Sequence, residues 1–172
     1  MQFEIRRYLP TDDLDALTDL IHRAYAPHLD SGLRYWGTHQ PASDTEKRLT
    51  SGLGFVMVID GRYAGTVVIR PPQPNSAVPL YREAHVYSLS QFCVAPEHKS
   101  KGLGRRLHDD AVNAARGMGA RTIALDTAKP AIALINLYKA WGYAVVGECD
   151  WRPDTNYVSV VMARQLETDC AV

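Results

Sequence analysis

Near its middle the chain reads Gln91-Phe-Cys-Val-Ala-Pro-Glu-His-Lys-Ser-Lys-Gly-Leu-Gly-Arg-Arg-Leu107. Its apolar start predicts a strand that ends at Val94, because Pro96 has no N–H with which to continue a sheet ladder. A short basic loop follows, then Gly102-Leu-Gly104, then residues spaced as in an amphipathic helix. A Gly-x-Gly pair alone is a weak indication of function. The order of strand, proline, basic loop, glycines and helix is a far more specific indication of a binding site.

The two glycines predict a site for a phosphate group. Glycine accepts positive φ, so the backbone N–H groups around it can turn toward a ligand. They lie where a helix begins, which is the end with unpaired donors and partial positive charge. The loop and the first helical turn hold Lys99, Lys101, Arg105 and Arg106 against one acid, Glu97. The alternative is a tight turn beneath a solvated basic face.

Composition narrows the class of protein. A chain of 172 residues can bury one sizeable core, so we expect residues 1–172 to form a single domain. Hydrophobic residues make up 46% and charged residues 22%, which is typical of a soluble globular protein. The net charge of +0 argues against a nucleic-acid partner bound through bulk charge.

We expect no membrane segment, no disulfide framework and no metal. Apolar runs such as Phe55–Ile59 are too short to span a bilayer, and the amino-terminal residues lack the apolar core of a signal peptide. The 3 cysteines are odd in number and form no CxxC pair, which favours a reducing cytoplasm. The 6 histidines show no metal-ligand spacing.

Hydrophobic periodicity and turn residues predict strands alternating with helices. We expect strands at residues 2–8, 55–59, 65–70, 86–94, 121–125, 143–148 and 156–163. We expect helices from residue 14 to Pro27 and at 43–51, 103–118 and 130–141, with Ser43 capping the second and Pro130 in the first turn of the last. Residues 28–42 and 71–83 are predicted to be irregular, and 167–172 to form a loose tail. Leu107, Ala111, Ala114 and Met118 should form the inward stripe of the third helix.

A helical crossover joins the strands at 86–94 and 121–125, so these strands should be parallel neighbours with a right-handed connection. A ligand crevice is then expected at their carboxyl ends, beside the glycine loop.

Two motifs give the chain a resemblance to the GNAT superfamily of N-acetyltransferases. Lys99-Ser-Lys-Gly-Leu-Gly104 is similar to the family's phosphate loop Gln/Arg-x-x-Gly-x-Gly/Ala, with Lys in the first position. Leu137-Tyr-Lys-Ala-Trp-Gly-Tyr143 is similar to the family's Leu-Tyr-x-x-x-Gly-Phe, although Ala131 stands where the family often has Asn. The resemblance extends in element order over residues 2–166.

The resemblance implies an α/β (α+β) fold: a mixed, mostly antiparallel sheet of about seven strands, with 86–94 and 121–125 as the central parallel pair and about four flanking helices. It also implies acetyl-CoA as co-substrate, with its pyrophosphate on the loop and its pantetheine arm along the preceding strand. The residues implied to bind it are Phe92, Cys93, Val94, Lys99, Ser100, Lys101, Gly102, Leu103, Gly104, Arg105 and Tyr138.

The resemblance assigns Tyr138 to the departing thiolate, with a core aromatic as the alternative. For the base we favour Asp126, which should close the strand at 121–125 and open into the crevice. Capping of the helix at 130 is an equal alternative for Asp126. Glu83, His85 and Tyr87 are weaker candidates.

The acceptor side should be lined by aromatic residues from two loops, which are Tyr35, Trp36, His39, Trp151 and Tyr157. Asp30, Asp150 and Asp154 could attract a cationic amine. The alternative is that Trp36 and Trp151 only seal core edges.

We therefore expect an enzyme that transfers acetyl directly to a primary amine of a small molecule or peptide. The main alternative is an acyl-CoA sensor of the same fold without turnover. An ATP or NAD protein is disfavoured, because neither GxxxxGK[ST] nor GxGxxG with a following acid occurs. A homodimer is possible if the apolar strand Val158–Met162 pairs with a partner's edge.

Overall fold

The computed structural model describes residues 2–167, so the expected loose tail at 167–172 lies outside the described residues apart from Glu167. The strands are β1 (Phe3–Arg7), β2 (Leu53–Ile59), β3 (Arg62–Arg70), β4 (Val86–Val94), β5 (Thr122–Ala128), β6 (Ala144–Asp150) and β7 (Val158–Gln165). The helices are α1 (Leu14–Asp30), α2 (Ala42–Leu49), α3 (Leu103–Gly117) and α4 (Ile132–Ala140), with short 3₁₀ turns at Trp36–Thr38, Pro79–Arg82 and Pro96–His98. Within residues 2–167, no helix is long and apolar enough to cross a bilayer.

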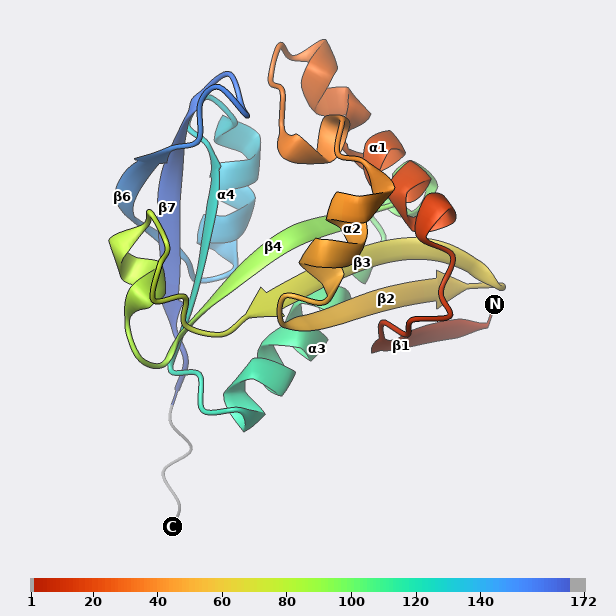
Figure 1. Ribbon diagram of the computed structural model, residues 1–172, viewed down its shortest axis with the longest axis horizontal. Helices are drawn as coiled ribbons and strands as arrows, with labels where there is room; N and C mark the ends of the chain where they lie inside the picture. The colour runs from red at the N-terminus through yellow and green to blue at the C-terminus, as the bar shows by residue number, and fades with distance from the viewer. Residues whose placement is uncertain (1, 168–172) are drawn as a thin grey trace.

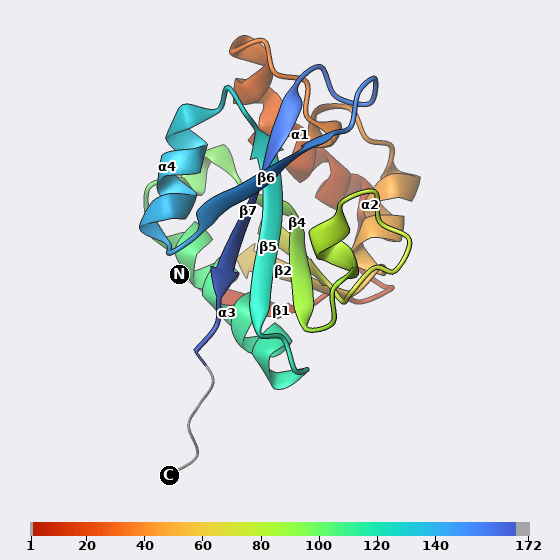
Figure 2. The ribbon, with the colours of Figure 1, turned by 90° about the vertical axis from the view of Figure 1, so that its left-hand side faces the viewer.

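All strands join one 7-stranded sheet in the order β1-β2-β3-β4-β5-β7-β6 (Figures 1 and 2). The pair β4 and β5 is parallel and every other pair is antiparallel, as the sequence predicts. Helix α3 supplies the crossover between the parallel strands. The predicted mixed sheet with four helices is therefore confirmed.

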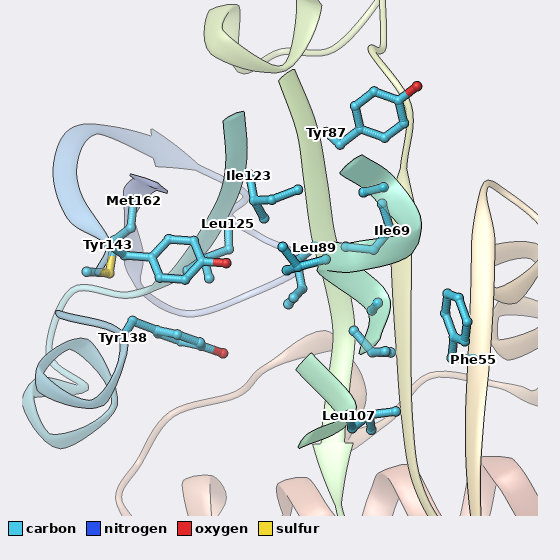
Figure 3. Packing of buried hydrophobic residues seen from close by; sticks show 14 of the residues in the cluster. Phe55, Ile69, Tyr87, Leu89, Leu107, Ile123, Leu125, Tyr138, Tyr143 and Met162 are labelled. Atoms are coloured by element: carbon cyan, nitrogen blue, oxygen red, sulfur yellow. The ribbon is translucent and has the colours of Figure 1, made fainter. Parts of the chain in front are cut away.

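Helices cover both faces of the sheet. Leu17, Leu20 and Ile21 of α1 pack on one face against Val56 and Val68. A larger core lies on the other face between the sheet and helices α3 and α4, and Figure 3 shows its aromatic and aliphatic members. Burial of these apolar side chains is the main stabilising contribution to the fold.

Several local predictions were wrong. Helix α1 continues through Pro27 to Asp30, because a proline in the last turn removes only the hydrogen bond to the carbonyl one turn earlier. Helix α2 begins after Pro41 without a side-chain cap, so Ser43 is not its cap. Pro130 precedes α4 instead of lying in its first turn. Met118 lies just past α3 and is 51% exposed.

Strand β7 lies between β5 and β6, and both neighbours pair with its main chain. The segment Val158–Met162 therefore offers no free edge to a partner, which contradicts the structural argument given for a homodimer. The edge strand on this side of the sheet is β6, where Val145 and Val146 are exposed.

Candidate active site

The two parallel strands separate after a short shared segment. Strand β4 pairs with β5 only from Val86 to Ser88. Farther along β4 the pairing with β3 shifts register, and Gln91 has a φ of 47°, which marks a bulge. Strand β4 therefore curves away from β5 and pairs with no residue of that strand beyond Ser88. The Phe92 carbonyl instead accepts a hydrogen bond from the Tyr25 hydroxyl of α1 at 3.1 Å.

A cavity of about 820 Å³ lies where the strands diverge. Its walls include most of the residues that the sequence predicts for the site. Those in the wall are Tyr35, Trp36, Phe92, Cys93, Val94, Lys99, Ser100, Gly102, Gly104, Arg105, Asp126, Tyr138, Trp151 and Tyr157. Lys101, Leu103 and His39 lie outside the cavity wall, and the ring of His39 packs edge-on against Trp36 with ring centroids 4.7 Å apart.

The glycine loop presents a series of unpaired backbone donors. Ser100 and Gly102 have φ values of 61° and 75°, and Gly102 is the N-cap of α3 without a side-chain cap. From Ser100 to Arg105, no backbone N–H donates to an acceptor within the described part of the chain. Consecutive free N–H groups at a helix N-terminus form an anion site.

The basic side chains around this loop differ in their partners. Arg105 forms an ion pair with Asp109 at 2.8 Å, and its guanidinium lies 5.3 Å from the ring centroid of Trp141. The ammonium groups of Lys99 and Lys101 donate to the carbonyls of Ala24 and Glu97. A carbonyl leaves the lysine charge uncompensated, so the positive field predicted for the loop persists at both lysines.

Tyr138 reaches from α4 with its hydroxyl directed toward β4 (Figure 3). The ring packs edge-on against Trp141 and Tyr143, and only 6% of the residue is exposed. Burial raises the pKa of the Tyr138 hydroxyl well above its usual value, and no hydrogen bond from residues 2–167 opposes that effect. The side chain is thus a core aromatic whose protonated hydroxyl remains free to donate into the cavity.

Asp126 lies within β5 and does not close it, because the strand continues to Ala128 by pairing with β7. Its carboxylate faces the cavity and accepts hydrogen bonds from the Tyr81 hydroxyl at 2.7 Å and the Trp151 indole at 2.8 Å. It caps no helix, so the alternative interpretation of Asp126 was wrong. No local pattern in the sequence indicates that Tyr81, from a proline-rich loop, holds this carboxylate.

The weaker base candidates lie outside the cavity wall. His85 interacts with the Gly119 carbonyl, and the Tyr87 hydroxyl donates to the Met118 carbonyl. Glu83 ends a 3₁₀ turn at the same remote end of β4. Asp30 and Asp150 also lie outside the wall, whereas Asp154 belongs to it.

The predicted aromatic residues from the two loops do meet. The rings of Tyr35 and Tyr157 lie 4.9 Å apart, and the Tyr35 hydroxyl shares a 2.9 Å hydrogen bond with Thr127. Trp36 donates to Asp44, and Trp151 donates to Asp126. Both indole N–H groups are therefore hydrogen-bonded, that of Trp151 to a residue of the cavity wall.

Sequence reasoning missed two arginines in the cavity wall. Arg48 lies on α2, where a polar helix gave no reason to single it out. Arg70 ends β3, where strand alternation places it on the same face as Val68. The available indication was the charge of Arg70 at the end of a row of apolar side chains on the inward face of β3.

The split sheet, the main-chain anion site and the cavity between them define an acyltransferase of the N-acetyltransferase fold. The chain belongs to the acetyltransferase (GNAT) family, whose model matches residues 14–143. It is an N-acetyltransferase by family, as the two sequence motifs indicate.

Individual relatives extend over nearly the whole chain. The S-(2-succino)cysteine N-acetyltransferase of Bacillus subtilis is 28% identical over 159 residues, covering 91% of this chain and 93% of the relative. The ribosomal-protein-S18-alanine N-acetyltransferase of Escherichia coli superimposes with a TM-score of 0.72 at 18% identity, covering 99% of both chains. The PaiA N-acetyltransferase of Thermoplasma acidophilum, solved with coenzyme A, has a TM-score of 0.71 at 16% identity, covering 96% of this chain and 100% of that one.

Proposed function

We propose that this chain transfers an acetyl group from acetyl-CoA directly to a primary amine of a small molecule or peptide. The observation that carries the proposal is the set of unpaired N–H groups from Ser100 to Arg105 beside the cavity. These groups fit a pyrophosphate, since the positive φ at Gly102 turns the backbone outward and no side chain fills the position.

In this proposal the loop and strand β4 would hold the coenzyme. The N–H groups of residues 100–105 would bind the pyrophosphate, with Lys99 and Arg105 adding positive charge. The part of β4 that has separated from β5, around Phe92 to Val94, would bind the extended arm through main-chain groups, in place of the Tyr25 hydroxyl at the Phe92 carbonyl. When bound, acetyl-CoA supplies an acetyl group activated as a thioester.

The chain's own residues then organise the transfer. A main-chain N–H of β4 near Cys93 polarises the carbonyl oxygen, as in other oxyanion sites. The amine nitrogen forms a bond to the carbonyl carbon, the carbon–sulfur bond breaks, and one amine proton passes toward Asp126 directly or through water. The Tyr138 hydroxyl gives a proton to the departing sulfur.

Direct transfer is favoured over a covalent acyl-enzyme. Cys93 is the only cysteine in the cavity wall, within the part of the chain described. Burial raises the pKa of its thiol to about 12, which keeps the sulfur protonated and weakly nucleophilic.

A sensor without turnover is the second candidate. It is favoured by the carboxylate of Asp126, which already accepts two hydrogen bonds and is less available as a base. Release of free coenzyme A thiol separates the two functions. A transferase releases thiol only when a suitable amine is added. A sensor binds coenzyme A, melts at a higher temperature with coenzyme A than without it, and releases no thiol with any amine.

The relative from Bacillus subtilis is named for an amino-acid derivative, S-(2-succino)cysteine. That name supports a small-molecule amine as the first acceptor to test here, ahead of peptides.

A further inference from the structure

Two arginines face the cavity without a carboxylate partner. Arg48 and Arg70 both line it, from α2 and from the end of β3. Neither forms an ion pair with any acid in residues 2–167, whereas six other arginine and lysine side chains there do: Arg6, Arg23, Arg105, Arg106, Lys129 and Arg152. The one hydrogen bond of Arg48 goes to the neutral amide oxygen of Gln40, at 2.9 Å.

Partial burial without a counter-ion has a free-energy cost for both groups. Desolvation lowers the pKa of Arg48 and of Arg70, and the positive charge of Arg48 lowers the pKa of Arg70 further. Two like charges held near each other in a partly dry wall are normally compensated by an anion. No side chain of the described residues supplies that anion by direct contact.

Neighbouring polar atoms lack partners as well. The Arg70 Nε, the Gln91 Nε2 and the Ser90 hydroxyl oxygen are buried without a hydrogen-bond partner in the described chain. All three residues line the same cavity. These buried N–H and O–H groups are donors, so the unsatisfied polar atoms beside the two arginines add no negative charge that would compensate them.

A negative charge lies across the cavity from the two arginines, on strand β5. Asp126 faces the cavity from β5, held in place by Tyr81 and Trp151. Its negative charge acts on both Arg48 and Arg70 without contacting either, so the charges of opposite sign are near but separate. A ligand that spans them must carry a cation and an anion.

The structure assigns the acceptor to a chemical class. We propose that it is a zwitterionic amino acid whose carboxylate binds Arg48 and Arg70 while its amine faces Asp126. The inference rests on the proposed function and narrows it. It disfavours polyamines and aminoglycosides, which lack a carboxylate, and peptide amino termini, which have an amide in its place.

Matched acceptors test the inference in the unmodified enzyme. The panel comprises the common L-amino acids and S-carboxyalkyl cysteines, each paired with its primary amide, together with polyamines, aminoglycosides and phosphoethanolamine. Thiol release with acetyl-CoA is measured for every member. We expect an amino acid to exceed its amide in kcat/KM by about tenfold or more, because the amide lacks the charge that strengthens such hydrogen bonds.

Variants of the two arginines test whether these side chains bind the carboxylate of the acceptor. Arg48→Gln and Arg70→Gln should each raise KM for the amino acid about tenfold or more and leave KM for its amide nearly unchanged. Arg48→Lys should recover part of the loss, since it keeps the charge but not the planar fork. Lys47→Gln, an exposed neighbour on α2, is the matched control and should change neither value. Coenzyme A affinity and melting temperature, measured on each variant, show whether it is folded.

The outcomes separate this inference from the proposed function. Equal turnover of acid and amide, preference for polyamines or aminoglycosides, or preference for phosphoethanolamine would overturn the assignment to an amino acid bound through its carboxylate and leave acetyl transfer intact. Coenzyme A binding with no thiol release from any acceptor would overturn the proposed function itself. If an arginine variant fails to fold, the comparison of acid with amide in the unmodified enzyme still decides whether the acceptor is recognised through its carboxylate.

Discussion

Replacing Gly104 by alanine should stabilise the protein and weaken coenzyme binding at the same time. Gly104 is in the first turn of α3, with helical and not positive φ. A Cβ there would lie 3.5 Å from a methyl group of Val94 and 3.7 Å from the ring of Phe92, which is ordinary contact distance. The fold therefore tolerates the methyl group, and alanine restricts the unfolded chain more than glycine does.

The two effects have different sizes. A glycine-to-alanine change inside a helix is worth about 0.5–1 kcal/mol of stability, or about 1–4 °C in melting temperature for a chain of this length. The same methyl group projects beside the N–H groups proposed to bind the pyrophosphate. Loss of one hydrogen bond to a charged oxygen costs about 1.5–3 kcal/mol, which is about 10- to 150-fold in Kd.

Thermal melting and calorimetric titration with coenzyme A measure both effects on one preparation. Gly117→Ala is the matched control, because Gly117 ends the same helix with open space around its Cβ position. That variant should gain stability and keep the Kd. If Gly104→Ala is stabilised and binds coenzyme A as tightly as the unmodified protein, the loop does not hold the pyrophosphate.

Three further changes have defined outcomes. Tyr138→Phe should lower kcat about tenfold or more with little change in coenzyme A affinity, and unchanged kcat would assign the residue to packing alone. Because burial raises the pKa of the Tyr138 hydroxyl, the pH profile of the unmodified enzyme should show no tyrosine ionisation up to about pH 10. Leu107→Ala should cost about 3 kcal/mol in urea unfolding, since Leu107 is fully buried, whereas Met118→Ala, at 51% exposure, should cost little. Arg6 donates to Asp12 and lowers the pKa of its carboxyl, so this pair stabilises the fold above about pH 4 and the contribution disappears as the pH falls through the lowered pKa. Asp12→Asn should cost about 2 kcal/mol at pH 7 and progressively less toward pH 2, whereas a loss independent of pH would exclude the ion pair as its cause.

The sequence predicted the sheet and the glycine loop because both follow from local patterns. Alternating apolar residues, a proline stop at Pro96 and the glycines at 102 and 104 determine nearby backbone geometry directly. The hairpin turn at Asp60-Gly61 is a similar case, with φ of 48° and 77° at its two residues. Errors at helix ends arose where tertiary packing outweighed local preference, as where α1 passes through Pro27.

The acceptor side could be predicted only in part, because it depends on contacts between residues distant in sequence. Tyr81 reaches Asp126 across 45 positions, and Gln40 reaches Gln91 across 51. No spacing rule links such residues in a single sequence. The aromatic loops were found by composition, whereas Arg48 was overlooked because an exposed and a half-buried arginine look alike on a short polar helix.

The two halves of the cavity depend on different parts of the polypeptide. The glycine loop offers main-chain N–H groups, which every residue except proline possesses, so neutral drift can replace the side chains of Ser100, Lys101 and Leu103 while the groove persists. The wall formed by Arg48, Arg70 and Asp126 acts through side chains, and a single codon change there alters which molecules fit. We therefore expect descendants of this chain to change their acceptor substrates long before they lose the ability to bind the acetyl donor.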